Sequence, residues 1–269
     1  MQGRLTQPIK DSIQAFPGSA WITELDVAKS LGFTDVEWTI DLEGFASHPL
    51  ISDQWINEIQ YGRKHLQFPL RTVTCDFFMQ VKPFPMTRSM QDEILELLSS
   101  LITSKNLGSR SCFVIPLVDG GSPRDRKDWK NLRGLMLELL PMLIESDSYF
   151  AFEFDVTPRS QLKFLEALAN EHFGTNFDMG NSASLGHDPE DEILETQKHI
   201  LNVHVKDRLH GGTTVPLGQG AVNFHKVFST LANIGYARSM TLQCARGLPG
   251  AERQQVLRYL NFCREAGLT

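Results

Sequence analysis

Apolar runs of strand length alternate with segments of helical periodicity along the whole chain, and this order restricts the fold more than any other feature. The expected strands are residues 1–5, 35–40, 71–77, 112–118, 149–154, 175–179, 200–205 and 239–244. One run, CFVIPLV at 112–118, is apolar throughout, as is typical of a parallel strand covered on both faces. Eight strand–helix units over 269 residues predict α/β architecture, a single (β/α)8 TIM barrel over residues 1–269, with a doubly wound open sheet as the alternative.

Helices are expected between these strands. Their predicted ranges are residues 21–31, 52–64, 89–103, 128–144, 223–234 and 250–266. Two more helices are expected to begin at Thr157-Pro158 and Asp188-Pro189, because proline is favoured in the first turn of a helix. Gly32 and Gly235 follow two of the predicted helices and are expected to end them.

The composition narrows the class of protein. A formal net charge of −6 argues against a nucleic-acid partner, which normally requires a basic surface. No run approaches the roughly 20 apolar residues of a membrane span, and the first residues lack the apolar core of a signal peptide. The four cysteines have no paired spacing, so reduced thiols in a cytoplasmic protein are expected.

Polar side chains recur at the C-terminal ends of the predicted strands, which is the end where such barrels carry their active sites. A single acid there often caps a neighbouring helix, and a single buried histidine is usually a hydrogen-bonded core residue. A series at successive strand ends indicates a common site. Its members are Glu37, Asp76, Asp119, Glu153, Asp178, His204 and Gln243.

Three of these residues have the chemistry of a metal site. Glu153 stands among phenylalanines, where an ionised carboxylate is costly without a cation. Asp178 opens a glycine-containing turn, and His204 lies inside an apolar strand. Two hard oxygens and an imidazole suit Mn²⁺, Zn²⁺, Co²⁺ or Fe²⁺, with Mg²⁺ as a further option. Gln243 offers a neutral fourth ligand.

Several local strings carry a resemblance to a known family. They are GFTDVEW (32–38), FDMGNSASLG (177–186), HVKDR (204–208) and VPLGQGAVNF (215–224). Together with Glu, Asp and His on three successive strands, they resemble the xylose isomerase-like superfamily, in its sugar-phosphate isomerase and epimerase branch. The strings MQGRL and TLQCAR (241–246) resemble an uncharacterised subgroup with glutamine at the fourth metal position.

The resemblance implies a divalent-metal-dependent sugar or sugar-phosphate isomerase or epimerase that removes a proton next to a carbonyl. The implied metal ligands are Glu153, Asp178, His204 and Gln243. Glu153 or Lys206 would move the proton. The implied substrate contacts are Glu37, Asn181, His187 and Arg208. Ordinary ion pairing is the alternative for Lys206 and Arg208, and Asp207 is expected to form a helix cap or salt bridge.

Gln243 departs from the family, because characterised epimerases hold a glutamate there and an amide cannot act as a base. A sugar or inositol-type dehydratase and a non-catalytic sugar-binding barrel therefore stay open as alternatives. An endonuclease of the same superfamily is disfavoured, since strands two to four supply no histidines and His48 falls in a loop. The expected partner is a small sugar or sugar phosphate, with no membrane; a homodimer is compatible with the sequence.

Overall fold

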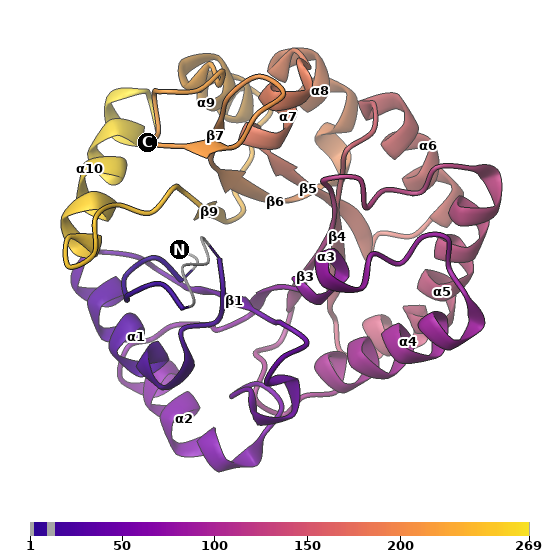
Figure 1. The fold of residues 1–269 in the computed structure, drawn as a ribbon, viewed down its shortest axis with the longest axis horizontal. Helices are drawn as coiled ribbons and strands as arrows, with labels where there is room; N and C mark the ends of the chain where they lie inside the picture. Colours follow the sequence, from indigo (N-terminus) through magenta and orange to yellow (C-terminus); the bar gives the residue numbers. More distant parts are fainter. Residues whose placement is uncertain (1–2, 10–13, 269) are drawn as a thin grey trace. The chain divides into compact units, whose positions relative to one another are not determined.

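The structure, a computed structural model, describes residues 3–9 and 14–268. Within these residues, seven strands form one sheet whose order follows the chain (Figure 1). The strands are β1 (Glu37–Thr39), β2 (Thr72–Thr74), β3 (Cys112–Leu117), β4 (Tyr149–Phe154), β5 (Phe173–Asp178), β6 (Ile200–Val205) and β9 (Met240–Leu242). Strands β2, β3, β4 and β5 pair in parallel in that order, and β6 pairs in parallel with β9.

Helices alternate with the strands, so the fold is the predicted α/β TIM barrel. The helices are α1 (Trp21–Ser30), α2 (Ile56–Lys64), α3 (Phe77–Val81), α4 (Arg88–Ile102), α5 (Arg126–Glu145), α6 (Pro158–Leu168), α7 (Met179–Leu185), α8 (Pro189–Thr196), α9 (Phe224–Asn233) and α10 (Glu252–Glu265). Thr157 and Asp188 accept hydrogen bonds from the first turns of α6 and α8, as the proline signals predicted. Gly32 and Gly235 have positive φ after α1 and α9.

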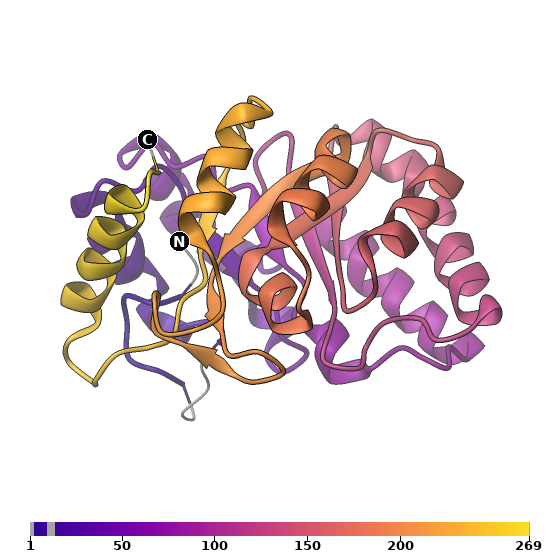
Figure 2. The same ribbon diagram turned by 90° about the horizontal axis from the view of Figure 1, so that it is seen from above.

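Some predictions of local structure are wrong. Residues 3–5 form no strand; residues 1–2 lie outside the described part of the chain. The predicted strand 71–77 is shorter, because Phe77 already begins α3. The segment after Asp178, predicted as a loop, is helix α7, since the Asp178 side chain caps it. The loop after β6 contains a two-stranded hairpin of β7 (Asp207–Arg208) and β8 (Thr214–Val215), orange in Figures 1 and 2.

The chain divides into two compact units, and the boundary passes through β1 and β5. One unit comprises residues 39–175, in which β3 and β4 pair over their whole length. Its core contains a phenylalanine cluster: Phe152 stacks on Phe154 with ring centroids 5.6 Å apart, and both rings contact Phe164 of α6. This cluster accounts for the aromatic composition of β4.

The other unit comprises the described residues up to 38 and from 176 onward. In it, α8 packs against α9, and α7 packs against β6 and β7. Single-domain organisation over residues 1–269 stays a prediction. Among the described residues, no helix combines the length and the apolar character that crossing a membrane requires.

Candidate metal centre

His204 is fully buried on β6, and polar groups lie against both of its ring nitrogens. Its Nε2 lies 2.9 Å from Glu37 Oε1. Its Nδ1 lies 3.0 Å from the Asn176 side-chain nitrogen and 3.7 Å from Asp178 Oδ2. Because an amide nitrogen can only donate, Nδ1 faces the Asn176 donor, and Glu37 lies at the other ring nitrogen. His204 therefore has a carboxylate near each of its ring nitrogens.

A buried network of two asparagines determines this arrangement. The Asn202 side-chain nitrogen donates to Glu37 Oε2 at 3.1 Å and to Asn176 Oδ1 at 2.9 Å. The second bond turns the Asn176 amide so that its nitrogen faces His204. Neither asparagine was among the residues predicted to form the site. The available signal was spacing: Asn176 is two residues before Asp178 and Asn202 two before His204, so each shares a strand face with a predicted ligand.

Asp178 ends β5 and uses its two carboxylate oxygens differently. Oδ1 accepts a hydrogen bond from the backbone nitrogen of Asn181 at 2.8 Å and caps α7. Oδ2 lies 3.2 Å from Lys206 Nζ as well as 3.7 Å from His204 Nδ1. Burial opposes ionisation of Asp178, but Lys206 and His204 outweigh it and lower the pKa of the carboxyl to about 2. Asp178 is therefore an anion with one oxygen facing His204 and Lys206.

Lys206 connects Asp178 with the predicted fourth ligand. Its Nζ donates to Gln243 Oε1 at 3.0 Å and to Asp178 Oδ2. The Lys206 side chain is 14% exposed, so most of its length is buried. It passes over Gly180, where an added Cβ would lie 2.9 Å from Lys206 Cγ. Glycine at 180 therefore leaves the space that this lysine needs. The ordinary ion pairing that was the alternative for Lys206 is present, with Asp178 as the partner.

Asp207 organises the glycine-rich loop that follows β6. Its Oδ2 accepts from the backbone nitrogens of Gly218 and Gly220, and its Oδ1 from that of Val222. A Cβ at Gly220 would collide with this carboxylate, which explains why the loop carries glycine there. The prediction of a helix cap or salt bridge was wrong, because a buried carboxylate can also be satisfied by loop amides alone.

Three of the predicted substrate contacts, Asn181, His187 and Arg208, lie around α7, whereas Glu37 lies on β1 next to His204. Arg208 donates to Asn181 Oδ1 at 2.7 Å and to the Gly212 carbonyl at 3.0 Å, so it links the helix to the hairpin. His187 follows the end of α7 with Nδ1 3.4 Å from Glu192 Oε2, and Glu192 raises the pKa of His187. Asn181 borders the centre through its bond to Asp178, whereas His187 is held by α8. Their roles in substrate binding stay predictions.

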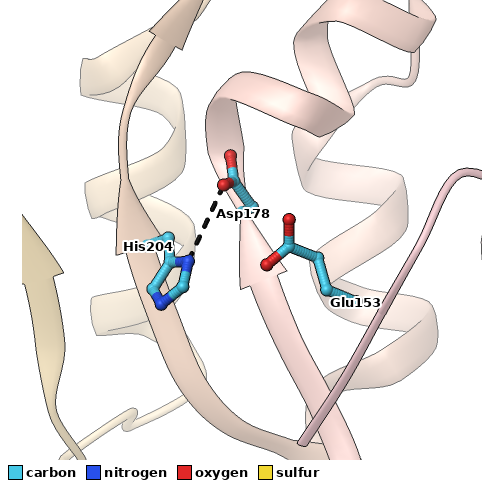
Figure 3. A group of neighbouring side chains, drawn as sticks. All are labelled: Glu153, Asp178 and His204. Atoms are coloured by element: carbon cyan, nitrogen blue, oxygen red, sulfur yellow. Dashed lines mark ion pairs between the residues drawn. The ribbon is translucent and has the colours of Figure 1, made fainter. Parts of the chain in front are cut away.

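Glu153 is buried next to the C-terminal end of β4, the strand that pairs with β5. With Asp178 and His204 it forms a group of three buried residues that could hold a metal ion, each offering one ligand atom. Figure 3 draws these three side chains and the ion pair of His204 with Asp178. The two carboxylates balance the charge of a divalent cation, and the imidazole of His204 supplies a nitrogen ligand. Glu37, 2.9 Å from Nε2, is a carboxylate of the kind that typically orients a ligating histidine. The donor set therefore fits a divalent metal.

Comparison with known proteins supports this assignment of the fold. The family model described as "Xylose isomerase-like TIM barrel" matches residues 25–264. The L-ribulose-5-phosphate 3-epimerase UlaE of Escherichia coli is 24% identical over 237 residues, which cover 81% of this chain and 80% of that protein. Both comparisons extend over most of the chain, and the family match includes all three residues of the candidate metal centre.

Solved structures show the same fold at lower identity. An L-ribulose 3-epimerase superimposes with a TM-score of 0.71 at 16% identity, covering 94% of this chain and 90% of that one. A xylose isomerase-like TIM barrel protein from Mycobacterium smegmatis, solved in complex with magnesium, has a TM-score of 0.66 at 16% identity, with coverage of 97% and 92%. At these identities the likeness concerns the fold.

Proposed function

The chain belongs to the xylose isomerase-like TIM barrel family, and on this premise we propose that it is a divalent-metal-dependent isomerase or epimerase of a ketose or ketose phosphate. The observation that carries the proposal is the group of Glu153, Asp178 and His204, ligand-type side chains buried at the ends of β4, β5 and β6. Relatives that act on L-ribulose or its 5-phosphate support the substrate class.

The residues would divide the chemistry as follows. Glu153, Asp178 and His204 would hold the ion. A bound divalent cation supplies a Lewis acid that polarises the substrate carbonyl and stabilises the developing enediolate charge. Glu37 keeps the His204 ring in place through Nε2. Asp178 is held as an anion by Lys206 and by the α7 cap.

The proton transfer would fall to Glu153. Its carboxylate accepts the proton from the carbon next to the carbonyl while the C–H electron pair moves into the enediolate. Delivery of that proton to the carbonyl carbon would complete an isomerisation, whereas an epimerisation would require a second group to deliver a proton to the opposite face of the same carbon. Gln243 cannot supply the second base that the latter requires, because an amide does not accept a proton at neutral pH. Arg208 and Asn181, which are bonded to each other, would bind substrate oxygens.

The experiment is solvent exchange. Protein loaded with Mn²⁺ is incubated in D₂O with L-ribulose 5-phosphate and with unphosphorylated ketopentoses and ketohexoses. We expect deuterium on the carbon next to the carbonyl of at least one ketose, detected by NMR, and its loss in Glu153→Gln. An aldose product identifies an isomerase, a 3-epimer identifies an epimerase, and loss of water identifies a dehydratase. No exchange in any ketose by metal-loaded protein contradicts the proposal.

A further inference from the structure

The Lys206 ammonium group is held at a defined position by two acceptors. Its ammonium group has three N–H donors, and two acceptors are in place: Asp178 Oδ2 at 3.2 Å and Gln243 Oε1 at 3.0 Å. Asp178 is one of the proposed ligands, and Gln243 stands where the family pattern implies the fourth. The ammonium group therefore bridges two of the four positions expected to hold the metal.

The surrounding chain is shaped to keep Lys206 there. Gly180 lies directly under the lysine, with an added Cβ 2.9 Å from Cγ and 3.1 Å from both the lysine Cβ and its carbonyl carbon. Any larger residue at 180 would displace the side chain. The next residue, Asp207, is fully buried and bonded to three loop amides, so the backbone that carries Lys206 is held firmly on its C-terminal side.

The chemistry of Gln243 agrees with this position. A neutral amide oxygen is a weak ligand for a divalent transition metal but a good acceptor for an ammonium group. A glutamate at 243 would add a negative charge that attracts a metal. Glutamine removes that charge and keeps the acceptor for Lys206. The Gln243 amide oxygen is therefore better suited to accept a hydrogen bond from Lys206 than to ligate a divalent cation.

We infer that Gln243 is not a metal ligand but the acceptor that, with Asp178, anchors the Lys206 ammonium group at the edge of the metal centre. The metal is then held by Glu153, Asp178 and His204 beside a resident positive charge. The third N–H of Lys206 is directed to a substrate oxygen that gains negative charge during the reaction. This inference rests on the proposed metal-dependent function and identifies Lys206 and Gln243 as a positioning pair within it.

The test is a Mn²⁺ titration by calorimetry, with free Mn²⁺ followed by electron paramagnetic resonance. Asp178→Asn is the reference for loss of a ligand, and we expect it to weaken binding at least 100-fold. Gln243→Met should change the affinity less than threefold and add no water to the coordination sphere of the bound Mn²⁺. Lys206→Met should tighten binding at least tenfold, because it removes a positive charge next to the cation. Lys206→Gln and Gln243→Ala serve as second variants, and thermal melts establish that each variant is folded.

Two results would overturn the inference. One is a Gln243→Met variant that loses as much affinity as Asp178→Asn and gains a bound water. The other is a Lys206→Met variant whose affinity is unchanged or weaker. Absence of Mn²⁺ binding in the wild type and in all variants would overturn the proposed function together with the inference. If the variants show the expected Mn²⁺ affinities but no ketose exchanges hydrogen with the solvent, the proposed function alone is overturned.

Discussion

The two compact units each contain a buried histidine, and the two sites differ in what surrounds the ring. His48, in the unit of residues 39–175, is 4% exposed, and its Nδ1 accepts from the backbone nitrogen of Leu50 at 3.1 Å. Burial lowers the pKa of His48 to about 3, although a backbone hydrogen bond with Thr39 acts in the opposite direction. His204, in the other unit, has Glu37 at one nitrogen and Asp178 near the other.

The comparison separates a structural histidine from one suited to ligate a metal. Burial removes water from both rings and favours the neutral form of His48, whose hydrogen bonds are with the backbone of Leu50 and Thr39. The neighbours of His204 include two carboxylates that attract positive charge, whether a proton or a metal ion. Burial is therefore a poor indicator of function, and the charge facing each nitrogen is the informative property.

The largest expected difference between the two histidines is in metal binding. His204→Ala should lower Mn²⁺ affinity by three orders of magnitude or more, about 4 kcal/mol, because it removes the only nitrogen donor of the proposed set. His48→Ala should leave the affinity within about threefold, since His48 is not one of the proposed ligands. Isothermal titration calorimetry measures both. Equal losses of Mn²⁺ affinity in His204→Ala and His48→Ala would show that the two histidines do not differ in metal binding.

The next largest expected effect is the dependence of the free energy of unfolding on pH, to which His48 contributes. The folded-state pKa of His48, about 3, lies below the unfolded value near 6.5, so the unfolded chain takes up the proton first as the pH falls. The stabilisation is complete above about pH 6.5 and is lost toward pH 3. Between pH 7.5 and 4.5 we expect the free energy of unfolding to fall by about 3 kcal/mol in urea titrations of metal-free protein.

His48→Gln is the matched control for this pH dependence, because glutamine does not titrate. The variant should lose most of the slope between pH 7.5 and 4.5. Asp178 does not cause this slope. Folding lowers its pKa to about 2, so Asp178 stabilises the folded protein above its unfolded pKa near 4, and that stabilisation is lost only below this pH. The same slope in His48→Gln as in the wild type would show that another group causes the loss.

A smaller effect is expected from the carboxylate behind His204. Glu37→Gln keeps an oxygen that can accept from Asn202 but removes the charge facing His204 Nε2. Loss of such an orienting partner typically costs 10- to 100-fold in metal affinity. Mn²⁺ titration of Glu37→Gln beside the wild type measures this. An unchanged affinity would mean that Glu37 contributes only to packing or substrate binding.

The smallest effect should come from the amide on the other nitrogen. Asn176→Ala removes the donor to His204 Nδ1, a neutral hydrogen bond worth about 1 kcal/mol, so Mn²⁺ affinity should change by less than about fivefold. The variant should instead lose stability, because Asn202 loses an acceptor. Urea unfolding and Mn²⁺ titration of the same sample separate the two effects. A loss as large as that of Glu37→Gln would show that the amides, rather than the carboxylates, distinguish His204 from His48.

The sequence by itself determined the order of strands and helices and the residues most suited to bind a metal. Strand β4 has the predicted bounds, and α6 and α8 begin where a cap is followed by proline. Glu153, Asp178 and His204 could be selected because strand periodicity and residue chemistry are local properties. Residues 3–5 of the predicted first strand form no strand, because so short a segment carries too little periodic signal.

Only the tertiary structure decided which atoms meet. Glu37 and Asn202 are 165 positions apart, and no local pattern indicates that one carboxylate contacts both that asparagine and His204. The anchoring of Lys206 by Asp178 and Gln243, and the use of Asp207 to hold a glycine loop, depend on side-chain directions as well as on strand order. Periodicity assigns a residue to a face of a strand, but the partner of its polar atoms is set by packing, where each buried donor and acceptor must be satisfied.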